Sequence, residues 1–186
     1  MDEKRLNESI INTTEDSSQI FTIINDVVNE YSKELDEVMS NIYDNIIMDN
    51  YPAISVIEKY FLELSNCLYV MCEKVEKVGV FDSISKSRAQ ETYNNKYLEH
   101  QSFNIGKTGA KKPTVAESTA NAEIGSLYDK TVNDIYSKAY KILKNKISAA
   151  ETMVTTLSKI LSHRMQESQL TVSQTGRQIL NEGEVF

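Results

Sequence analysis

The chain has 186 residues, of which 40% are hydrophobic and 25% are charged, and its formal net charge is −7. Only two prolines and six glycines interrupt it, which favours long helices over a many-stranded β fold. No apolar run is long enough to cross a bilayer and the first residues do not resemble a signal peptide, so we expect a cytoplasmic protein without a membrane partner.

Residues 1–50 form an acidic N-terminal region with three Lys/Arg and twelve Asp/Glu, a balance of −9. We expect loose order over residues 1–17 and an amphipathic helix from Ser18 to about Asp49. Its acidic face is either a solvated surface or a docking surface for a basic partner or for a basic segment of this chain.

The next stretch, from Ile54 to Val78, carries an unbroken heptad repeat of apolar residues, which predicts a helix with one continuous buried seam. Pro52 before it and Gly79 after it are typical of helix ends. A second apolar set, including Leu62 and Tyr69, lies off the seam, so we expect a homo-oligomer larger than a dimer. The seam ends at Val78, and we take its other members as the oligomerisation surface: Ile54, Ile57, Phe61, Leu64, Leu68, Met71 and Val75.

The two cysteines, Cys67 and Cys72, are five residues apart and so do not share a helix face. Neither histidine is near them in sequence, which disfavours a metal site. We therefore predict buried, reduced thiols and an intracellular protein.

A basic connecting segment follows over residues 83–113, and residues 86–112 have a balance of +4 from six Lys/Arg and two Asp/Glu. The pattern predicts a third helix over residues 83–97 and then a Gly/Lys loop over residues 106–113. Thr114 and Glu117 form a capping-box sequence that starts a long last helix, which Gly125 is expected to bend. We place the core at residues 51–169 and a flexible C-terminal tail at residues 170–186.

The basic segment mixes cations with tyrosines, a combination that suits single-stranded nucleic acid. Lysine and arginine neutralise phosphates whatever the sequence, and tyrosine rings stack on bases. The alternative is that these lysines only solubilise a loop while the tyrosines pack on neighbouring helices. The candidate nucleic-acid-binding residues are Lys86, Arg88, Tyr93, Lys96, Lys107, Lys111 and Lys112.

The order Lys86-Ser-Arg88, tyrosines, Gly/Lys loop and long helix ending at Leu161-Ser-His-Arg-Met resembles the UvsY-type recombination mediators of tailed phages. The resemblance covers residues 51 to about 166, and Lys86 and Arg88 match the family's Lys-x-Arg pair. It implies a helical hairpin assembled into a ring. It also implies binding of single-stranded DNA, displacement of single-strand-binding protein and loading of a RecA-type recombinase in the host cytoplasm.

No catalytic, dinucleotide or metal motif is found in the sequence, so we expect a non-enzyme without a cofactor. The expected fold is all-α, with long helices in a hairpin or coiled-coil arrangement that assembles as a homo-oligomer. The competing function is a coiled-coil scaffold or assembly protein of a phage, which would use the same heptads without nucleic acid.

Overall fold

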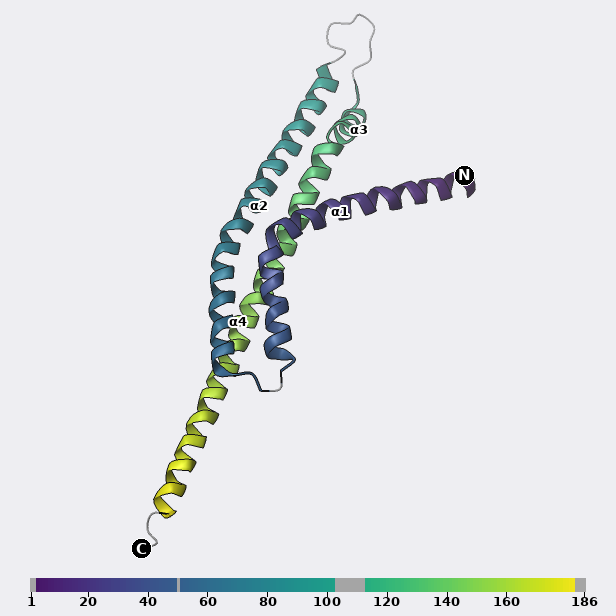
Figure 1. The fold of residues 1–186 in the computed structure, drawn as a ribbon. Coiled ribbons are helices and arrows are strands. Elements are labelled where there is room, and N and C mark those ends of the chain that lie inside the picture. The colour runs from purple at the N-terminus through teal and green to yellow at the C-terminus, as the bar shows by residue number, and fades with distance from the viewer. Residues whose placement is uncertain (1–2, 50, 103–112, 183–186) are drawn as a thin grey trace, which may run out of the picture. The chain divides into compact units, whose positions relative to one another are not determined.

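The computed structural model describes residues 3–49, 51–102 and 113–182, and every regular element in these ranges is a helix (Figure 1). Helix α1 spans Glu3–Ile42 and is followed by η1, a π-helical turn over Tyr43–Ile47. Helix α2 spans Ile54–Ser102, α3 spans Val115–Gly125 and α4 spans Leu127–Glu182. The predicted all-α class is therefore confirmed. None of these helices has a stretch long and apolar enough to cross a membrane.

Three of these helices extend further than the sequence patterns predicted. Helix α1 begins at Glu3 rather than Ser18, because the intervening residues include no proline or glycine to prevent it. Helix α2 passes through Gly79 and ends at Ser102, so the predicted helix end at Gly79 and the separate third helix are wrong. Helix α4 continues to Glu182, beyond residue 170, where we had expected the regular structure to stop.

Gly79 serves a packing role in the middle of α2 rather than a capping role. A Cβ atom at this position would lie 2.9 Å from Cε2 of Tyr140, so only glycine lets the tyrosine ring lie this close to the helix backbone. Within the continuous α2, the Ser83 hydroxyl donates to the Gly79 carbonyl at 3.0 Å.

The predicted capping box at the start of α3 is confirmed. The Glu117 amide donates to Oγ1 of Thr114 at 3.2 Å, and the Thr114 amide donates to Oε2 of Glu117 at 2.8 Å. Helix α3 then ends at the glycine that we had expected to bend it, Gly125, and Ser126 separates it from α4. The Lys96 side chain occupies the space beside this glycine, where a Cβ would lie 2.9 Å from Cγ of Lys96.

The contacts divide the chain into two compact units, a division that differs from the sequence boundaries at residues 50 and 170. Unit 1 comprises Met1–Tyr31 and Glu73–Lys144, and unit 2 comprises Ser32–Cys72 and Asn145–Phe186. Each unit therefore takes one part of α1, one part of α2 and one part of α4. The two units are described separately below.

In unit 1, the second part of α2 lies antiparallel to α3 and the first part of α4 (Figure 1). Cross-helix contacts show the direction, because residue numbers fall along α3 and α4 as they rise along α2. Glu76 pairs with Lys144, Thr92 donates to Asp129, and His100 contacts Ser118, which links α2 to α3. The hairpin arrangement expected from the sequence is thus present inside this unit.

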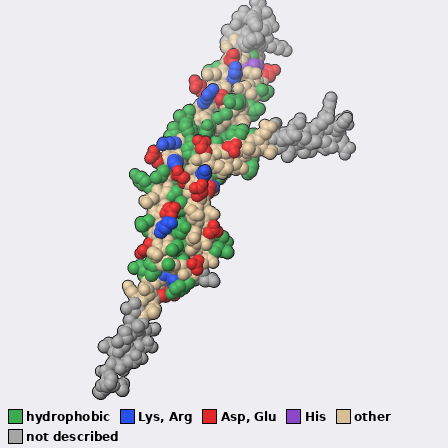
Figure 2. Space-filling model, viewed as in Figure 1, with side chains coloured by type: hydrophobic (Ala, Val, Ile, Leu, Met, Phe, Trp, Pro, Cys, Tyr) green, Lys and Arg blue, Asp and Glu red, His purple; other side chains and the backbone are tan. Residues whose placement is uncertain are grey.

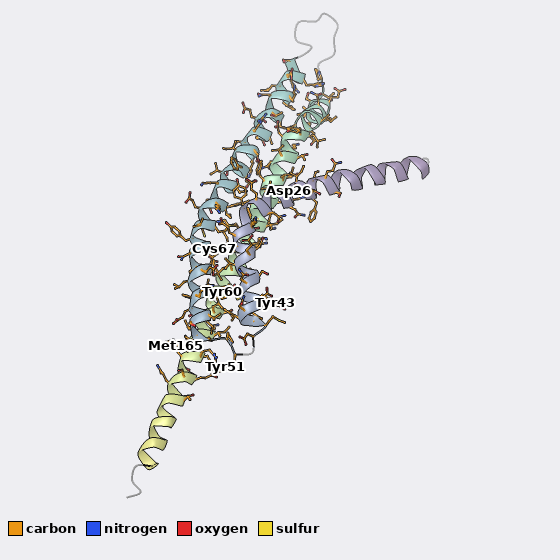
Figure 3. All side chains as sticks on the ribbon, viewed as in Figure 1. Asp26, Tyr43, Tyr51, Tyr60, Cys67 and Met165 are labelled. Atoms are coloured by element: carbon orange, nitrogen blue, oxygen red, sulfur yellow. The ribbon has the colours of Figure 1, made fainter. Side chains whose placement is uncertain are left out.

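Unit 2 combines η1 with parts of α1, α2 and α4 around an apolar core. On its edge, Nζ of Lys146 contacts both carboxylate oxygens of Asp36 at 2.6 Å, and Nη2 of Arg164 donates to the Pro52 carbonyl at 3.0 Å. The Arg164 guanidinium also stacks over the ring of Tyr51, which is labelled in Figure 3. The buried apolar residues of the core are Leu35, Val38, Ile42, Ile46, Ile57, Tyr60, Leu64, Leu68, Met71, Ile147, Ala150 and Leu157.

The predicted heptad seam of α2 is buried within a single chain. Ile54 and Phe61 are half-buried and the other seam residues are buried. Other helices of the same chain therefore cover the seam. In the second apolar set, Leu62 and Tyr69 are exposed, at 61% and 83%. The prediction of two buried cysteines is wrong: Cys67 is half-buried and Cys72 is exposed, because Cys72 lies one residue past Met71 and off the seam.

The seam gives a direct prediction for stability. Leu64 is fully buried, so Leu64→Ala should lower the free energy of unfolding by about 2–5 kcal/mol through lost burial and a residual cavity. Leu62→Ala is the matched control on the same helix and should change it by less than about 0.5 kcal/mol. Urea unfolding followed by circular dichroism measures both, and equal losses would contradict the single buried seam.

The Glu76–Lys144 pair of unit 1 predicts a pH dependence. The hydrogen bond from Lys144, and then its charge, hold the pKa of Glu76 below the ordinary value of 4.5. Because the pKa is lower in the folded than in the unfolded state, the contribution is present above about pH 4.5 and is lost as the pH falls through the folded-state pKa. The urea midpoint of Glu76→Gln should therefore lie below that of wild type at neutral pH, and the two midpoints should become equal in acid. A gap that does not depend on pH would contradict this assignment.

Candidate nucleic-acid interface

A polar hollow lies on one side of the α2–α4 hairpin of unit 1, and we call it the lysine hollow. It has a volume of about 390 Å³ and takes residues from α2, α3 and α4. Lys86 and Lys130 bring two cations to it from opposite helices, and Tyr93 contributes an aromatic ring. Its full lining is Lys86, Ala89, Gln90, Tyr93, Glu123, Lys130 and Asn133.

The electrostatics of the lysine hollow are locally positive in a chain that is acidic overall. Nζ of Lys130 lies 5.1 Å from the centroid of the Tyr93 ring, within cation–π range. Glu123 is the one carboxylate among the described residues of the lining, so the two lysines outnumber it. Across the visible face in Figure 2, basic and acidic side chains are interspersed, so any attraction for a polyanion is local.

Arg88 lies outside the lysine hollow, although it is only two residues from Lys86. It lines a different groove of about 300 Å³, which we call the aromatic groove, together with Phe81, Tyr128 and Tyr136. Nε of Arg88 lies 3.3 Å from Oδ1 of Asp129, whose other oxygen accepts from the Thr92 hydroxyl at 2.8 Å. The structure therefore separates the predicted Lys-x-Arg pair, as two positions about 200° apart around a helix require.

Polar contacts between the two hollows hold α2 against α4. The side-chain amide of Asn133 donates to the Asp82 carbonyl at 3.1 Å, to Oδ1 of Asp82 at 3.2 Å and to Oγ of Ser85 at 3.2 Å. Ser85 and Ala89 are buried and continue the seam of α2 in small residues. The backbones therefore approach closely here, and the larger side chains line hollows on either side.

The remaining predicted site residues are placed less favourably. Lys96 packs its stem against Gly125, and its Nζ lies 2.9 Å from a carboxylate oxygen of Glu99, so its charge is already paired. Lys107, Lys111 and Lys112 lie outside the described residues. Of the predicted nucleic-acid-binding residues that the structure describes, only Lys86 and Tyr93 are brought together in the lysine hollow.

Lys130 and Asn133 were missed as site residues in the sequence analysis. Both residues are far from Lys86 in the sequence but lie close to it in the structure. This closeness depends on the register of α4 against α2, which the sequence pattern does not give. The available signal was the heptad phase of α2: continued past Val78, it reaches Ser85, Ala89 and Thr92, and so marks the helix face that α4 must cover.

In the part of the chain that the structure describes, no group of three His, Cys, Asp or Glu side chains could hold a metal ion. Comparisons of the chain with protein-family models, with curated proteins and with solved structures find no match. The lysine hollow must therefore be interpreted from its own chemistry.

The polar contacts of Asn133 predict a local stability effect. Asn133→Ala should lower the free energy of unfolding by about 1–3 kcal/mol, because the buried Ser85 hydroxyl and the Asp82 backbone lose a partner. Asp134→Ala, at the exposed neighbouring position, is the matched control and should be nearly neutral. Thermal unfolding of both variants measures the difference. A neutral Asn133→Ala would show that these contacts do not stabilise the hairpin.

Proposed function

We propose that the protein binds single-stranded DNA through the lysine hollow and acts as a non-catalytic recombination mediator. The observation that carries this proposal is the convergence of Lys86, Lys130 and Tyr93 from two helices on one hollow. The resemblance of residues 51–166 to UvsY-type mediators supports the same function. It adds a RecA-type recombinase and a single-strand-binding protein as the expected partners.

The chemistry of the hollow suits a flexible strand better than a duplex. Two ammonium groups can each neutralise a phosphate and release counterions, which gives affinity without sequence preference. The exposed Gln90 offers an amide beside them, and the half-buried Tyr93 offers an aromatic ring on which a base can stack. The strand's unstacked bases reach such a surface, whereas paired bases do not.

One hollow binds weakly, because two phosphate contacts supply little free energy at physiological salt. Several copies along one strand would raise the affinity without any new kind of contact. The mediator function therefore implies an assembly of more than two copies, as the family resemblance also does. Arg88 has most of its side chain exposed and extends the contact only if Asp129 releases it.

The test replaces the two lysines of the hollow. The double variant Lys86→Ala/Lys130→Ala should bind oligo-dT and mixed-sequence single strands more weakly, and to the same extent. It should also flatten the slope of log affinity against log salt concentration by about 0.7 per lost phosphate contact, about 1.4 per subunit. The matched control is Lys59→Ala with Lys159→Ala, which removes the same charge from exposed positions of unit 2. Lys59 also lies over a tyrosine ring, that of Tyr60, at 5.2 Å.

Fluorescence anisotropy over a salt series measures both pairs of variants. An equal effect of the two pairs would show only a loss of net charge, and wild-type binding by the Lys86/Lys130 variant would overturn the site. Tyr93→Leu should weaken binding without changing the salt slope, because it removes stacking and not a charge.

A second candidate function is a coiled-coil scaffold with no nucleic-acid role. The observation in its favour is the long seam of α2, which is buried at most of its positions from Ile57 to Ala89. If wild-type protein gives no salt-dependent shift of labelled oligo-dT, this second function becomes the better one.

A further inference from the structure

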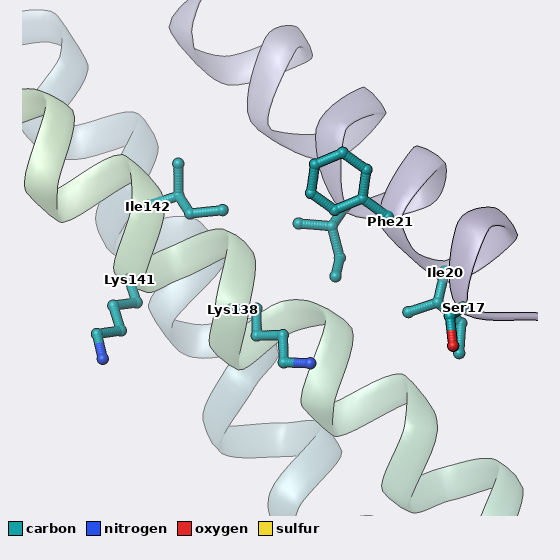
Figure 4. Close-up of a pocket in the computed structure, with 7 residues that line it drawn as sticks. Ser17, Ile20, Phe21, Lys138, Lys141 and Ile142 are labelled. Carbon is teal, nitrogen blue, oxygen red and sulfur yellow. The ribbon is translucent and has the colours of Figure 1, made fainter. Parts of the chain in front are cut away.

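A second hollow in unit 1, formed between α1 and the first part of α4, is both apolar and basic. We call it the socket. Figure 4 shows side chains of α1 on one wall and side chains of α4 on the other. It has a volume of about 350 Å³, near the lower end of the range for binding pockets. Its lining consists of Ser17, Ile20, Phe21, Ile24, Lys138, Lys141 and Ile142.

The lining of the socket specifies what could fill it. Phe21 is 62% exposed and, with Ile20 and Ile24, gives the socket an apolar wall on α1. Lys138 and Lys141 are exposed, and neither has an ion-pair partner among the described side chains. Among the side chains that the structure describes, no carboxylate lines the socket. A fitting occupant is therefore an apolar surface that carries negative charge.

The chain itself presents such a surface at η1 in unit 2. Tyr43, Ile47 and Met48 are large apolar side chains with exposures of 53%, 44% and 64%, and Asp44 and Asp49 stand beside them. We call these five residues the knob; Tyr43 is labelled in Figure 3.

The backbone of the knob is also unusual. The Met48 amide donates to the Tyr43 carbonyl at 3.0 Å, which is the i→i+5 bond of a π-helix. Such turns are rare and occur frequently at functional sites. Ile46 points into the core of unit 2 and anchors the turn, so its neighbours are held at the surface.

We propose that the knob of one copy docks in the socket of a second copy. Apolar side chains of the knob would cover Phe21, while Asp44 and Asp49 would approach Lys138 and Lys141. Knob and socket are different surfaces, so the contact is heterologous and repeats from copy to copy, which gives a ring or an open chain rather than a closed dimer. This inference stands apart from the nucleic-acid proposal, because none of these residues lines the lysine hollow.

The experiment reverses the charges on each side separately. One variant carries Lys138→Glu and Lys141→Glu, and the other carries Asp44→Lys and Asp49→Lys. Each reversal sets like charges against each other, so each variant alone should associate at least about tenfold more weakly than wild type in sedimentation velocity. Wild type should associate at micromolar concentration, and less so as salt is raised.

Mixing the two variants provides the discriminating result. In an equimolar mixture, the unchanged acidic knob of the first variant meets the unchanged socket of the second, and the reversed knob meets the reversed socket. Both contacts then pair opposite charges, so the mixture should recover the association of wild type. Unfolding or a simple loss of solubility would not be repaired by mixing.

Two further variants test the apolar part. Phe21→Ser should weaken association, whereas Tyr69→Ser, at a more exposed aromatic position outside both surfaces, should leave it unchanged. Circular dichroism checks the helix content of each variant. A wild type that stays monomeric, charge reversals without effect, or a mixture that fails to recover would each overturn the proposal. Equal weakening by Phe21→Ser and Tyr69→Ser would do the same.

Discussion

The buried face of α2 is the constraint on which the rest of the structure depends. It repeats every seven residues, and its composition changes along the helix. In unit 2 it carries large apolar residues such as Leu64 and Leu68, whose burial drives packing. In unit 1 it changes beyond Val78 to Ser85 and Ala89, which bury little apolar area but let α4 approach. Hydrogen bonds from Asn133 and Thr92 then stabilise a contact that apolar burial alone would leave weak.

This change of composition also determines where a site can form. Small residues on the seam let the backbones of α2 and α4 come close together. The larger side chains on either side of the seam project beyond this contact between the two helices. Lys86 and Arg88 lie on opposite sides of Ser87 in sequence and on opposite sides of the seam in space. The lysine hollow and the aromatic groove are thus two consequences of one packing arrangement.

Helix class, the capping box at Thr114 and the seam of α2 could all be predicted from the sequence, because each depends on residues close together in the chain. Gly79 misled the prediction because its role is set by Tyr140, 61 positions away, and local helix-end rules contain no information about that ring. Lys130 was missed for the same reason: periodicity gives the face that a helix buries but not the register of its partner. The seam continues past Val78 in small and polar residues, so the apolar repeat alone ends before it reaches the site.

The proposed binding of DNA depends on the proposed assembly of copies, but the assembly does not depend on DNA. A hollow with two lysines and one carboxylate gives weak binding, so a useful affinity for DNA requires several copies on one strand. A contact between knob and socket requires no DNA, because its apolar and charged parts complement each other without a third component. A heterologous contact also repeats from copy to copy, so it brings one lysine hollow into the assembly with each added copy. If both proposals hold, assembly comes first, and the polyanion then binds to a repeated array of hollows rather than assembling the copies itself.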